Sequence, residues 1–274
     1  MAMNLKNTLK QILPNGICEY SVRRHTFLRM GLASRDAARM AFRARTYRAI
    51  CDARLELLPK AITANLQTCV DAGAHEGSWT RALLMIFHPE LVLLVECEPR
   101  LVDQLKNTVG KLPGTQVVDA ALSGEDGAAD FFQLRHPAGS SLLKPRDDIG
   151  EQFERDSWDV VGRAQVKTVS YDCLVEPYAE VSILKLDIQG SETRVLRSSV
   201  SGLKKTKAVI MEVPFVSHYE DDSTFPHLNE LMKQKGFGLY RLSDTYQRGA
   251  GRALFADAVY VREEILQGLT APGA

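Results

Sequence analysis

The stretch 68–77 constrains the fold of this chain more than any other. It reads Thr-Cys-Val-Asp-Ala-Gly-Ala-His-Glu-Gly, an apolar run that ends on Asp71 and continues into a turn with two glycines. An apolar run of this kind predicts a buried strand, and the glycines allow the backbone to turn tightly into a helix expected from Ser78. A strand, a glycine turn and a helix in this order are shared by several nucleotide-binding α/β folds.

Strand and helix patterns alternate along the rest of the chain. Strands are predicted at 67–71, 91–98, 115–120, 181–187, 208–213, 238–242 and 253–261, and helices at 78–87, 100–109, 191–199 and 224–235. Alternating β and α units imply an α/β fold with a mostly parallel sheet and helices on both faces. The alternation stops at 123–166, where residues 127–134 predict one short strand. The polar segment 137–159 predicts a loop that either covers a substrate site or is a plain surface insertion.

Residues 1–60 differ in charge from the remainder. They hold 12 Lys or Arg residues against 4 acidic residues, although the whole chain has a net charge of zero. Residues 35–58 lack proline and glycine, which predicts a helix that Pro59 ends. We therefore expect a helical, basic N-terminal region at 1–62, an α/β domain at 63–265 and a loose tail at 266–274. The basic region is either a solvated face or a surface for peripheral contact with an anionic partner.

Composition and spacing argue against several classes of protein. A net charge of zero gives no general attraction to nucleic acid, so we expect no nucleic-acid partner. No apolar run reaches the length of a membrane span, and no secretory signal is recognisable. The five cysteines are scattered without a CxxC pair. We therefore assign no metal ligand and expect a reducing, cytoplasmic location.

Acidic residues stand at the ends of three successive predicted strands. Asp71 ends the first, Glu98 the second and Asp119 the third. Ligands of open α/β sheets bind beyond the carboxyl ends of the strands. Asp71 would repel a phosphate and suits a cationic ligand, whereas Glu98, preferred over Glu96, could accept hydrogen bonds from ribose hydroxyls. Asp119 and Ala120 would lie near an adenine. Each acid could instead cap a helix.

A second polar cluster lies on the predicted strand 181–187. Lys185 and Asp187 point to the same face, because side chains alternate along a strand. A lysine in a central strand needs a charged partner, and either Asp187 or Glu212 could supply it. This cluster is either a structural ion pair or the polar centre of a reaction site.

The order of these segments resembles the FkbM family of S-adenosylmethionine-dependent methyltransferases. The matching segments are 70–77, Glu98-Pro99, 120–123, 184–192 and 210–213, with 236–240 downstream. The resemblance covers roughly residues 65–262 and implies a class I, Rossmann-like methyltransferase fold. Such a fold has a seven-stranded, mostly parallel sheet whose last strand is antiparallel. His75 departs from the family, which more often has asparagine there.

The resemblance also implies a cofactor and an activity. The cofactor would be S-adenosyl-L-methionine, and the enzyme would methylate a hydroxyl of a sugar, glycolipid or secondary metabolite. The implied cofactor-binding residues are Asp71, Gly73, His75 and Gly77 around the methionine part, Glu98 at the ribose, Asp119 and Ala120 at the adenine, and Ser141 in the covering loop.

Asp187 is the first candidate for a general base that accepts the proton of the acceptor hydroxyl. Glu212 and His218 are the alternatives, and Lys185 would keep Asp187 ionised. Two other functions fit part of the pattern. The chain could be a non-catalytic, cofactor-binding partner in a biosynthetic assembly, or an NAD-dependent oxidoreductase. The missing third glycine and Asp71 disfavour the second of these.

Overall fold

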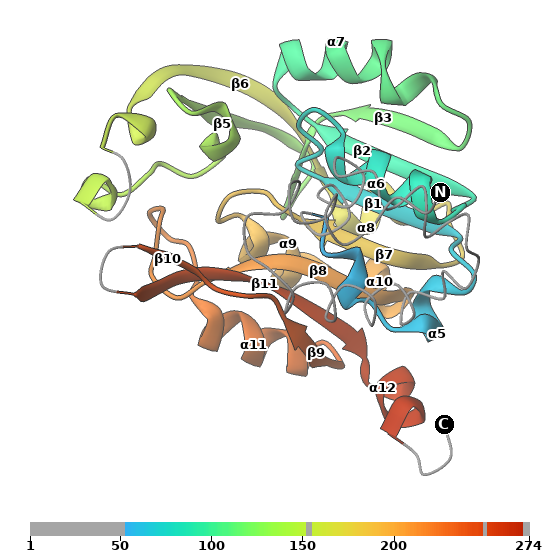
Figure 1. Ribbon diagram of the computed structural model, residues 1–274. Coiled ribbons are helices and arrows are strands. Elements are labelled where there is room, and N and C mark those ends of the chain that lie inside the picture. Colours follow the sequence, from blue (N-terminus) through green and yellow to red (C-terminus); the bar gives the residue numbers. More distant parts are fainter. Residues whose placement is uncertain (1–52, 152–154, 249–250, 271–274) are drawn as a thin grey trace, which may run out of the picture.

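A computed structural model describes residues 53–151, 155–248 and 251–270 of the chain. Its main sheet has eight strands, of which seven follow the order β10-β11-β8-β7-β1-β2-β3, while β9 pairs with β11 (Figure 1). The strands are β1 (Thr68–Ala72), β2 (Leu91–Glu96), β3 (Thr115–Asp119), β7 (Val181–Leu186), β8 (Thr206–Pro214), β9 (Phe237–Leu242), β10 (Tyr246–Arg248) and β11 (Arg252–Arg262).

The direction of the strands agrees with the sequence. β3, β2, β1, β7 and β8 are parallel, and β11 runs antiparallel to β8 and β9. A mostly parallel sheet with an antiparallel last strand is thereby confirmed. β10 adds an eighth strand, because the chain turns back after β9 and pairs residues 246–248 with β11.

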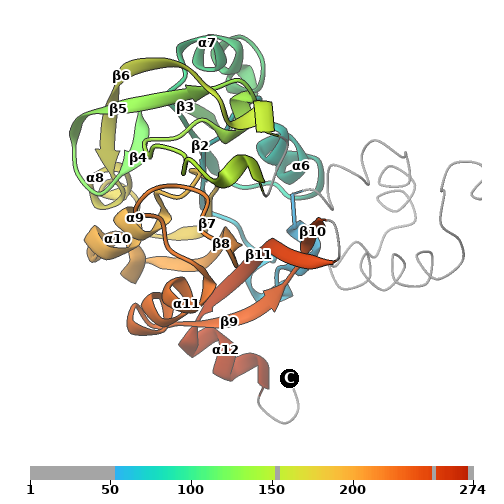
Figure 2. The same ribbon diagram turned by 90° about the vertical axis from the view of Figure 1, so that its left-hand side faces the viewer.

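Helices cover both faces of this sheet, as expected (Figure 2). They are α5 (Lys60–Thr63), α6 (Ser78–Ile86), α7 (Pro99–Asn107), α8 (Tyr171–Val175), α9 (Glu192–Ser198), α10 (Ser201–Lys204), α11 (Phe225–Gln234) and α12 (Glu263–Thr270). Alternate strand residues face opposite sides, so Cys69 packs with α6 and α7, whereas Val70 packs with α8, α9 and α11. None of the described helices is long and apolar enough to cross a membrane.

A second, three-stranded sheet fills the region where the alternation stops. Its strands β4 (Ala121–Ser123), β5 (Gly127–Leu134) and β6 (Val160–Ser170) lie in the order β4-β6-β5. β5 is the short strand that the sequence predicts, whereas β6 was not predicted. Between β5 and β6 lie three short 3-10 helices, η3 (Pro137–Gly139), η4 (Ile149–Glu151) and η5 (Arg155–Trp158).

Both ends of the α/β domain differ from the expected boundaries. Within the described part of the predicted helix 35–58, the chain forms only the 3-10 helix η1 (Leu55–Leu57), because Arg54 adopts a left-handed backbone conformation with φ of 56°. Leu55 is fully buried in the core beside α6, so this segment belongs to the domain. Residues 266–270, expected in a loose tail, form part of α12. The rest of the basic region and residues 271–274 lie outside the described residues.

Candidate active site

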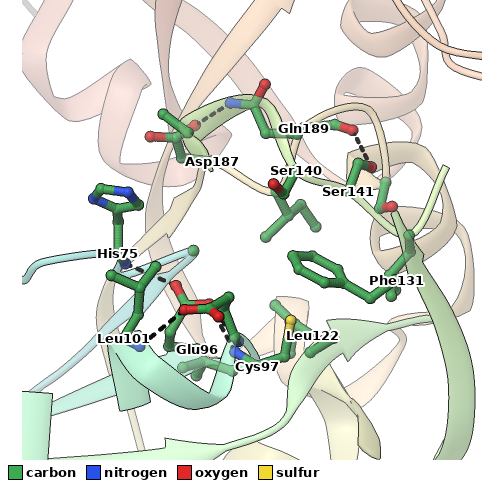
Figure 3. Close-up of a pocket in the computed structure, with 18 of the residues that line it drawn as sticks. His75, Glu96, Cys97, Leu101, Leu122, Phe131, Ser140, Ser141, Asp187 and Gln189 are labelled. Carbon is green, nitrogen blue, oxygen red and sulfur yellow. Dashed lines mark hydrogen bonds between the residues drawn. The ribbon is translucent and has the colours of Figure 1, made fainter. Parts of the chain in front are cut away.

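A cavity of about 350 Å³ opens at the carboxyl ends of β1, β2 and β7 (Figure 3). We call it the first cavity. Its walls come from the turn after β1, the start of α7, the segment 120–122, the loop 137–142 and the segment after β7. Phe131 and Leu122 give it an apolar side, and His75, Leu101 and Asp187 lie toward the other end. The sequence predicted a ligand site at this edge of the sheet.

The lining of the first cavity is acidic. Four carboxylate side chains line it, namely Glu96, Glu98, Asp187 and Glu212. Among the residues that the structure describes, no lysine or arginine lines it. Lys185 lies 3.2 Å from Asp187 and Arg100 lies 3.4 Å from Glu98, but on the wall itself a pyrophosphate would meet carboxyl groups, whereas a ligand with positive charge would be attracted. The cavity therefore favours a cationic ligand over a dinucleotide.

Lys185 links three elements beneath the first cavity. Its Nζ lies 3.1 Å from Asp71 Oδ1 and 3.2 Å from Asp187 Oδ2, and it donates a hydrogen bond to the Gly73 carbonyl oxygen at 3.2 Å. Burial alone would lower the pKa of Lys185, but the two carboxylates raise it above its ordinary value. Asp71 is fully buried and also accepts a hydrogen bond from Thr80 Oγ1 at 2.7 Å. It therefore holds Lys185 and does not line the cavity.

Strand register explains which carboxylates pair with Lys185. Asp71 of β1 lies directly beside Lys185 of β7, so their side chains leave the sheet together. On the other side, Lys185 lies beside Ile210 of β8, and Glu212 comes two residues later. Of the two partners proposed from the sequence, the structure shows Asp187 and does not show Glu212.

The turn after β1 depends on three residues in the left-handed conformation, namely Gly73, His75 and Gly77. Asparagine and histidine tolerate this conformation better than most side chains, which explains why His75 can replace the family's asparagine. The His75 backbone N–H donates to Glu96 Oε2 at 2.8 Å. Gly73 and His75 line the first cavity. Gly77, which precedes α6, packs instead against Leu105 and Val109.

Glu96 and Glu98 both line the cavity but differ in their bonds. Glu96 is buried, and its two oxygens accept hydrogen bonds from the backbone N–H groups of His75, Cys97 and Glu98. Glu98 caps α7, because its Oε2 accepts from the Leu101 backbone N–H at 3.0 Å. The structure therefore shows Glu98 as a helix cap that also faces the cavity, and its contact with a ribose stays a prediction.

The third acidic strand end does not reach the cavity. The Asp119 side chain is 58% exposed and forms an ion pair with Lys106 of α7 at 3.1 Å. Only its neighbour Ala120, together with Ala121 and Leu122, lines the first cavity. The Asp119 side chain leaves the edge strand β3 toward α7, and its position beside a bound adenine stays a prediction.

The segment after β7 fastens the loop 137–142 to the cavity. Asp187 Oδ1 accepts a hydrogen bond from Gln189 Nε2 at 2.8 Å, and the Gln189 carbonyl oxygen accepts one from Ser141 Oγ at 2.6 Å. Tyr219 Oη lies 3.0 Å from Gln189 Oε1 and 2.7 Å from the Gly139 carbonyl oxygen. Ser141, expected to contact the cofactor, thus lines the cavity while its hydroxyl holds the loop in place.

The two remaining candidates occupy different positions. Glu212 lines the first cavity, and burial raises the pKa of its carboxyl group well above the ordinary value. The nearby carboxylates of Asp187, Asp257 and Glu192 raise it further. His218 does not line the first cavity. It is buried against the rings of Trp158, Tyr219 and Phe255, and burial lowers its pKa to about 4.

A model of the family described as methyltransferase FkbM domain matches residues 71–239, more than half of the chain. The chain belongs to this methyltransferase family. Its strand order, with β11 antiparallel between β8 and β9, is the class I methyltransferase arrangement that the resemblance implied. The fold class expected from the sequence is thereby confirmed.

Individual relatives of this FkbM-family chain are distant. It is 23% identical over 164 residues to the 2-O-methyltransferase NoeI of Sinorhizobium fredii. That match covers 55% of this chain and 65% of NoeI, which is slightly less than two thirds of that protein.

Several solved methyltransferase structures are similar to this chain at low sequence identity. Methyltransferase FkbM from Methylobacillus flagellatus KT is 13% identical with a TM-score of 0.43, covering 88% of this chain and 58% of that one. Magnesium protoporphyrin IX methyltransferase (ChlM) from Synechocystis PCC 6803 with bound SAM is 10% identical with a TM-score of 0.43, covering 86% and 96%. The family match and the strand order, rather than these low TM-scores, establish the fold class.

Sequence reasoning missed a second cavity and the residue that divides it from the first. The second cavity has a volume of about 410 Å³ and shares Ala138, Gln189 and Glu212 with the first. Gln189 adopts a left-handed conformation with φ of 53°. Its place in the segment Lys-Leu-Asp-Ile-Gln-Gly, one of the family-like segments, was the only signal that could have pointed to it.

Proposed function

We propose that this FkbM-family chain is an S-adenosylmethionine-dependent O-methyltransferase that acts on a hydroxyl of a sugar, glycolipid or secondary metabolite. The acidic lining of the first cavity carries the proposal. S-adenosylmethionine has a sulfonium and an ammonium group, which suit a wall that carries acidic side chains and, among the described residues, no lysine or arginine. The similarity to NoeI, a 2-O-methyltransferase, supports oxygen as the methylated atom. The same lining disfavours NAD.

The residues of the first cavity fit such a cofactor. Glu98 would accept hydrogen bonds from the ribose hydroxyls, and Leu122 and Phe131 would pack against the adenine. Gly73 and the turn around His75 would hold the methionine part. When bound, the cofactor supplies a methyl group that its sulfonium already activates, so the protein contributes alignment and removal of one proton.

Asp187 is the proton acceptor in this proposal. Its side chain is 44% exposed and lines the first cavity, and its Oδ2 lies 3.2 Å from Lys185 Nζ. The hydrogen bond from Gln189 fixes the direction of the carboxylate. As the acceptor oxygen takes the methyl group, its proton passes to a carboxylate oxygen of Asp187. Glu212, in the wall shared by the two cavities, is the second candidate.

Calorimetry with S-adenosylmethionine and S-adenosylhomocysteine tests the cofactor site. We expect micromolar binding to the wild type and a loss of at least about tenfold in Glu98→Ala, because hydrogen bonds to a charged group are removed. Asp119→Ala is the matched control and should bind like the wild type, since Asp119 does not line the cavity. Absence of binding to the wild type would refute the proposed function.

The Asp187→Asn variant tests the proton acceptor. Turnover, followed as S-adenosylhomocysteine formed with an acceptor that the wild type methylates, should fall by at least about a hundredfold. Cofactor affinity should remain close to that of the wild type, because Asn keeps the size of the side chain. Glu212→Gln is the comparison variant. Near-normal turnover in Asp187→Asn together with loss in Glu212→Gln would transfer the role to Glu212.

A further inference from the structure

The proposed cofactor brings a negative group into an acidic cavity. Besides its sulfonium and ammonium groups, S-adenosylmethionine carries an α-carboxylate at the end of its methionine part. Four carboxyl side chains line the first cavity, and one more carboxylate without a positive partner would cost binding free energy. The α-carboxylate therefore needs a donor or a cation beside the turn that follows β1, where the methionine part is expected.

The backbone of that turn has few hydrogen-bond donors left for a ligand. The N–H groups of residues 73 and 74 both donate to the Val95 carbonyl oxygen, at 3.0 and 3.1 Å. The N–H of residue 77 donates to the carbonyl oxygen of residue 74 at 2.7 Å, and that of His75 donates to Glu96 Oε2 at 2.8 Å. Of the five N–H groups at 73–77, only that of Glu76 has no such partner among the described residues.

The two cations close to the cavity are already engaged. Lys185 Nζ has three partners, two carboxylates and a carbonyl oxygen, which matches its three N–H donors. Arg100 forms an ion pair with Glu98 at 3.4 Å, and its side chain is 90% exposed. Neither Lys185 nor Arg100 lines the first cavity. Neither is therefore placed to meet the α-carboxylate.

His75 is the one lining residue, within the described ranges, whose side chain can carry a positive charge. Its ring lies at the same end of the first cavity as Asp187 (Figure 3). Among the residues that the structure describes, the ring forms no hydrogen bond or ion pair. Histidine side chains ordinarily change charge between pH 5 and 8, and a carboxylate beside such a ring favours its protonated form.

We infer that the His75 side chain binds the α-carboxylate of the cofactor as an imidazolium, so that cofactor binding takes up a proton. Affinity then falls as the pH rises, because fewer free protein molecules carry the protonated ring. This inference rests on the proposed function, and it adds the chemistry of one contact and a pH dependence. The dependence belongs to this chain, since the asparagine that the family more often has here can donate a hydrogen bond but carries no charge.

Other ionisable groups surround the cavity and have to be separated from His75. They are Glu76 in the same turn, Glu96, Cys97, Glu98 and Arg100 from β2 to the start of α7, Lys185 and Asp187 at the end of β7, and Glu212 on β8. Burial raises the pKa of Glu212 and of Glu192 behind the cavity, so these carboxyl groups could also exchange protons when a ligand binds. A substitution confined to His75 leaves all of them in place.

Calorimetry with S-adenosylhomocysteine on the full chain tests the inference. The dissociation constant of the wild type should rise about tenfold between pH 5.5 and pH 7.5, as expected when a histidine must be protonated to bind. Titrations at pH 7 in two buffers of different ionisation enthalpy should show that a fraction of a proton is taken up for each ligand bound.

Two variants and a second ligand assign the effect. His75→Asn keeps a side chain that tolerates the left-handed backbone and removes the charge, so its dissociation constant should change less than about twofold over this pH range. His88→Asn is the matched control and should behave like the wild type, because His88 is exposed and lines neither cavity. The analogue of S-adenosylhomocysteine that lacks the carboxyl group but keeps the amine should bind the wild type without the pH dependence.

The outcomes separate this inference from the proposed function. If S-adenosylhomocysteine binds equally well at both pH values, or binds without proton uptake, the inference is wrong and the cofactor site stands. It is equally wrong if His75→Asn keeps the pH dependence, because the carboxyl groups then cause it. Persistence of the dependence with the analogue would also overturn it, because the ring then meets another part of the ligand. Failure of the wild type to bind S-adenosylhomocysteine at either pH counts against the proposed function itself.

Discussion

The carboxyl group of Glu192 is buried in the interior, behind the first cavity. Glu192 is only 5% exposed, and its Oε1 accepts a hydrogen bond from the Ile188 backbone N–H at 3.1 Å. Burial raises the pKa of Glu192 to about 7. Ile188 lies between Asp187 and Gln189, so Glu192 holds the segment that carries both. The ordinary pKa of Glu192 applies in the unfolded chain, which makes stability depend on pH.

Glu192→Gln should remove part of that dependence. Between pH 4.5 and 7 the unfolded chain releases the Glu192 proton while the folded chain keeps it, so the wild type loses stability as the pH rises. The expected loss is about 3 kcal/mol, from roughly 2.5 pKa units. Glutamine keeps an oxygen for the Ile188 N–H and does not titrate. Urea denaturation of both proteins at pH 5 and pH 8 measures their free energies of unfolding. Relative to the wild type, the variant should be more stable at pH 8 than at pH 5 by about that amount. An equal difference at both pH values would contradict the assignment.

Individual side chains were predictable where strand geometry fixes their direction. The two-residue period correctly placed Lys185 and Asp187 on one face, and their ion pair follows from it. Position at a strand end did not fix the direction of Asp119, because β3 is an edge strand and Lys106 attracts its carboxylate away from the cavity. Gln189 was out of reach, since its role depends on a left-handed backbone and on the distant Tyr219.

Elements were predictable where both faces of a strand are buried. β2 is an apolar run up to Glu96, and β7 is apolar apart from Ser182 and Lys185; both lie between two layers of helices, and the sequence identified them. β6 escaped because its side chains alternate between exposed and partly buried positions over residues such as Arg163, Gln165 and Lys167. That alternation is itself a strand signal, but it begins inside the region 123–166, where the strand and helix patterns stop alternating, and no strand is predicted there beyond residue 134.

The close approach of the chain after β1 to the chain after β7 depends on glycine at position 73. Its φ is 71°, and a methyl group at this position would overlap the backbone carbonyl oxygen of Asp187. Gly73→Ala should therefore reduce the free energy of unfolding by about 3 kcal/mol or more, through backbone strain and displacement of the Asp187 segment. It should also weaken cofactor binding. Chemical denaturation and calorimetry measure the two effects.

Gly251→Ala is the control for the strain alone. Gly251 also has a positive φ, of 88°, but the nearest atom to an added methyl group is 3.8 Å away on the flexible side chain of Gln247. We expect a loss of about 1 kcal/mol and no change in cofactor affinity. Equal losses at the two positions would show that the close approach of β1 and β7 is not important.

At the scale of the whole molecule, the change in charge near residue 60 does not mark the edge of the packed domain. Trp79 Nε1 of α6 donates a hydrogen bond to the Ala53 carbonyl oxygen at 3.0 Å, and Arg54 forms an ion pair with Asp257 of β11. Leu55 is buried in the same core cluster. A change in composition reports which residues are solvated, whereas a domain boundary depends on which residues are buried. The segment 53–62 belongs to the basic region by sequence, but its apolar side chains are part of the core.

Leu55→Ala in the full chain tests this conclusion. Truncating a fully buried leucine leaves a cavity among α6, β1 and β7 residues, and we expect the free energy of unfolding to fall by about 3 kcal/mol. Leu57→Ala is the matched control, because Leu57 belongs to the same 3-10 helix but is only partly buried, and it should cost about 1 kcal/mol. Urea denaturation at pH 7 measures both. If Leu55→Ala costs no more than Leu57→Ala, residues 53–62 are an appendage, and the α/β domain begins near residue 63 as the sequence alone suggested.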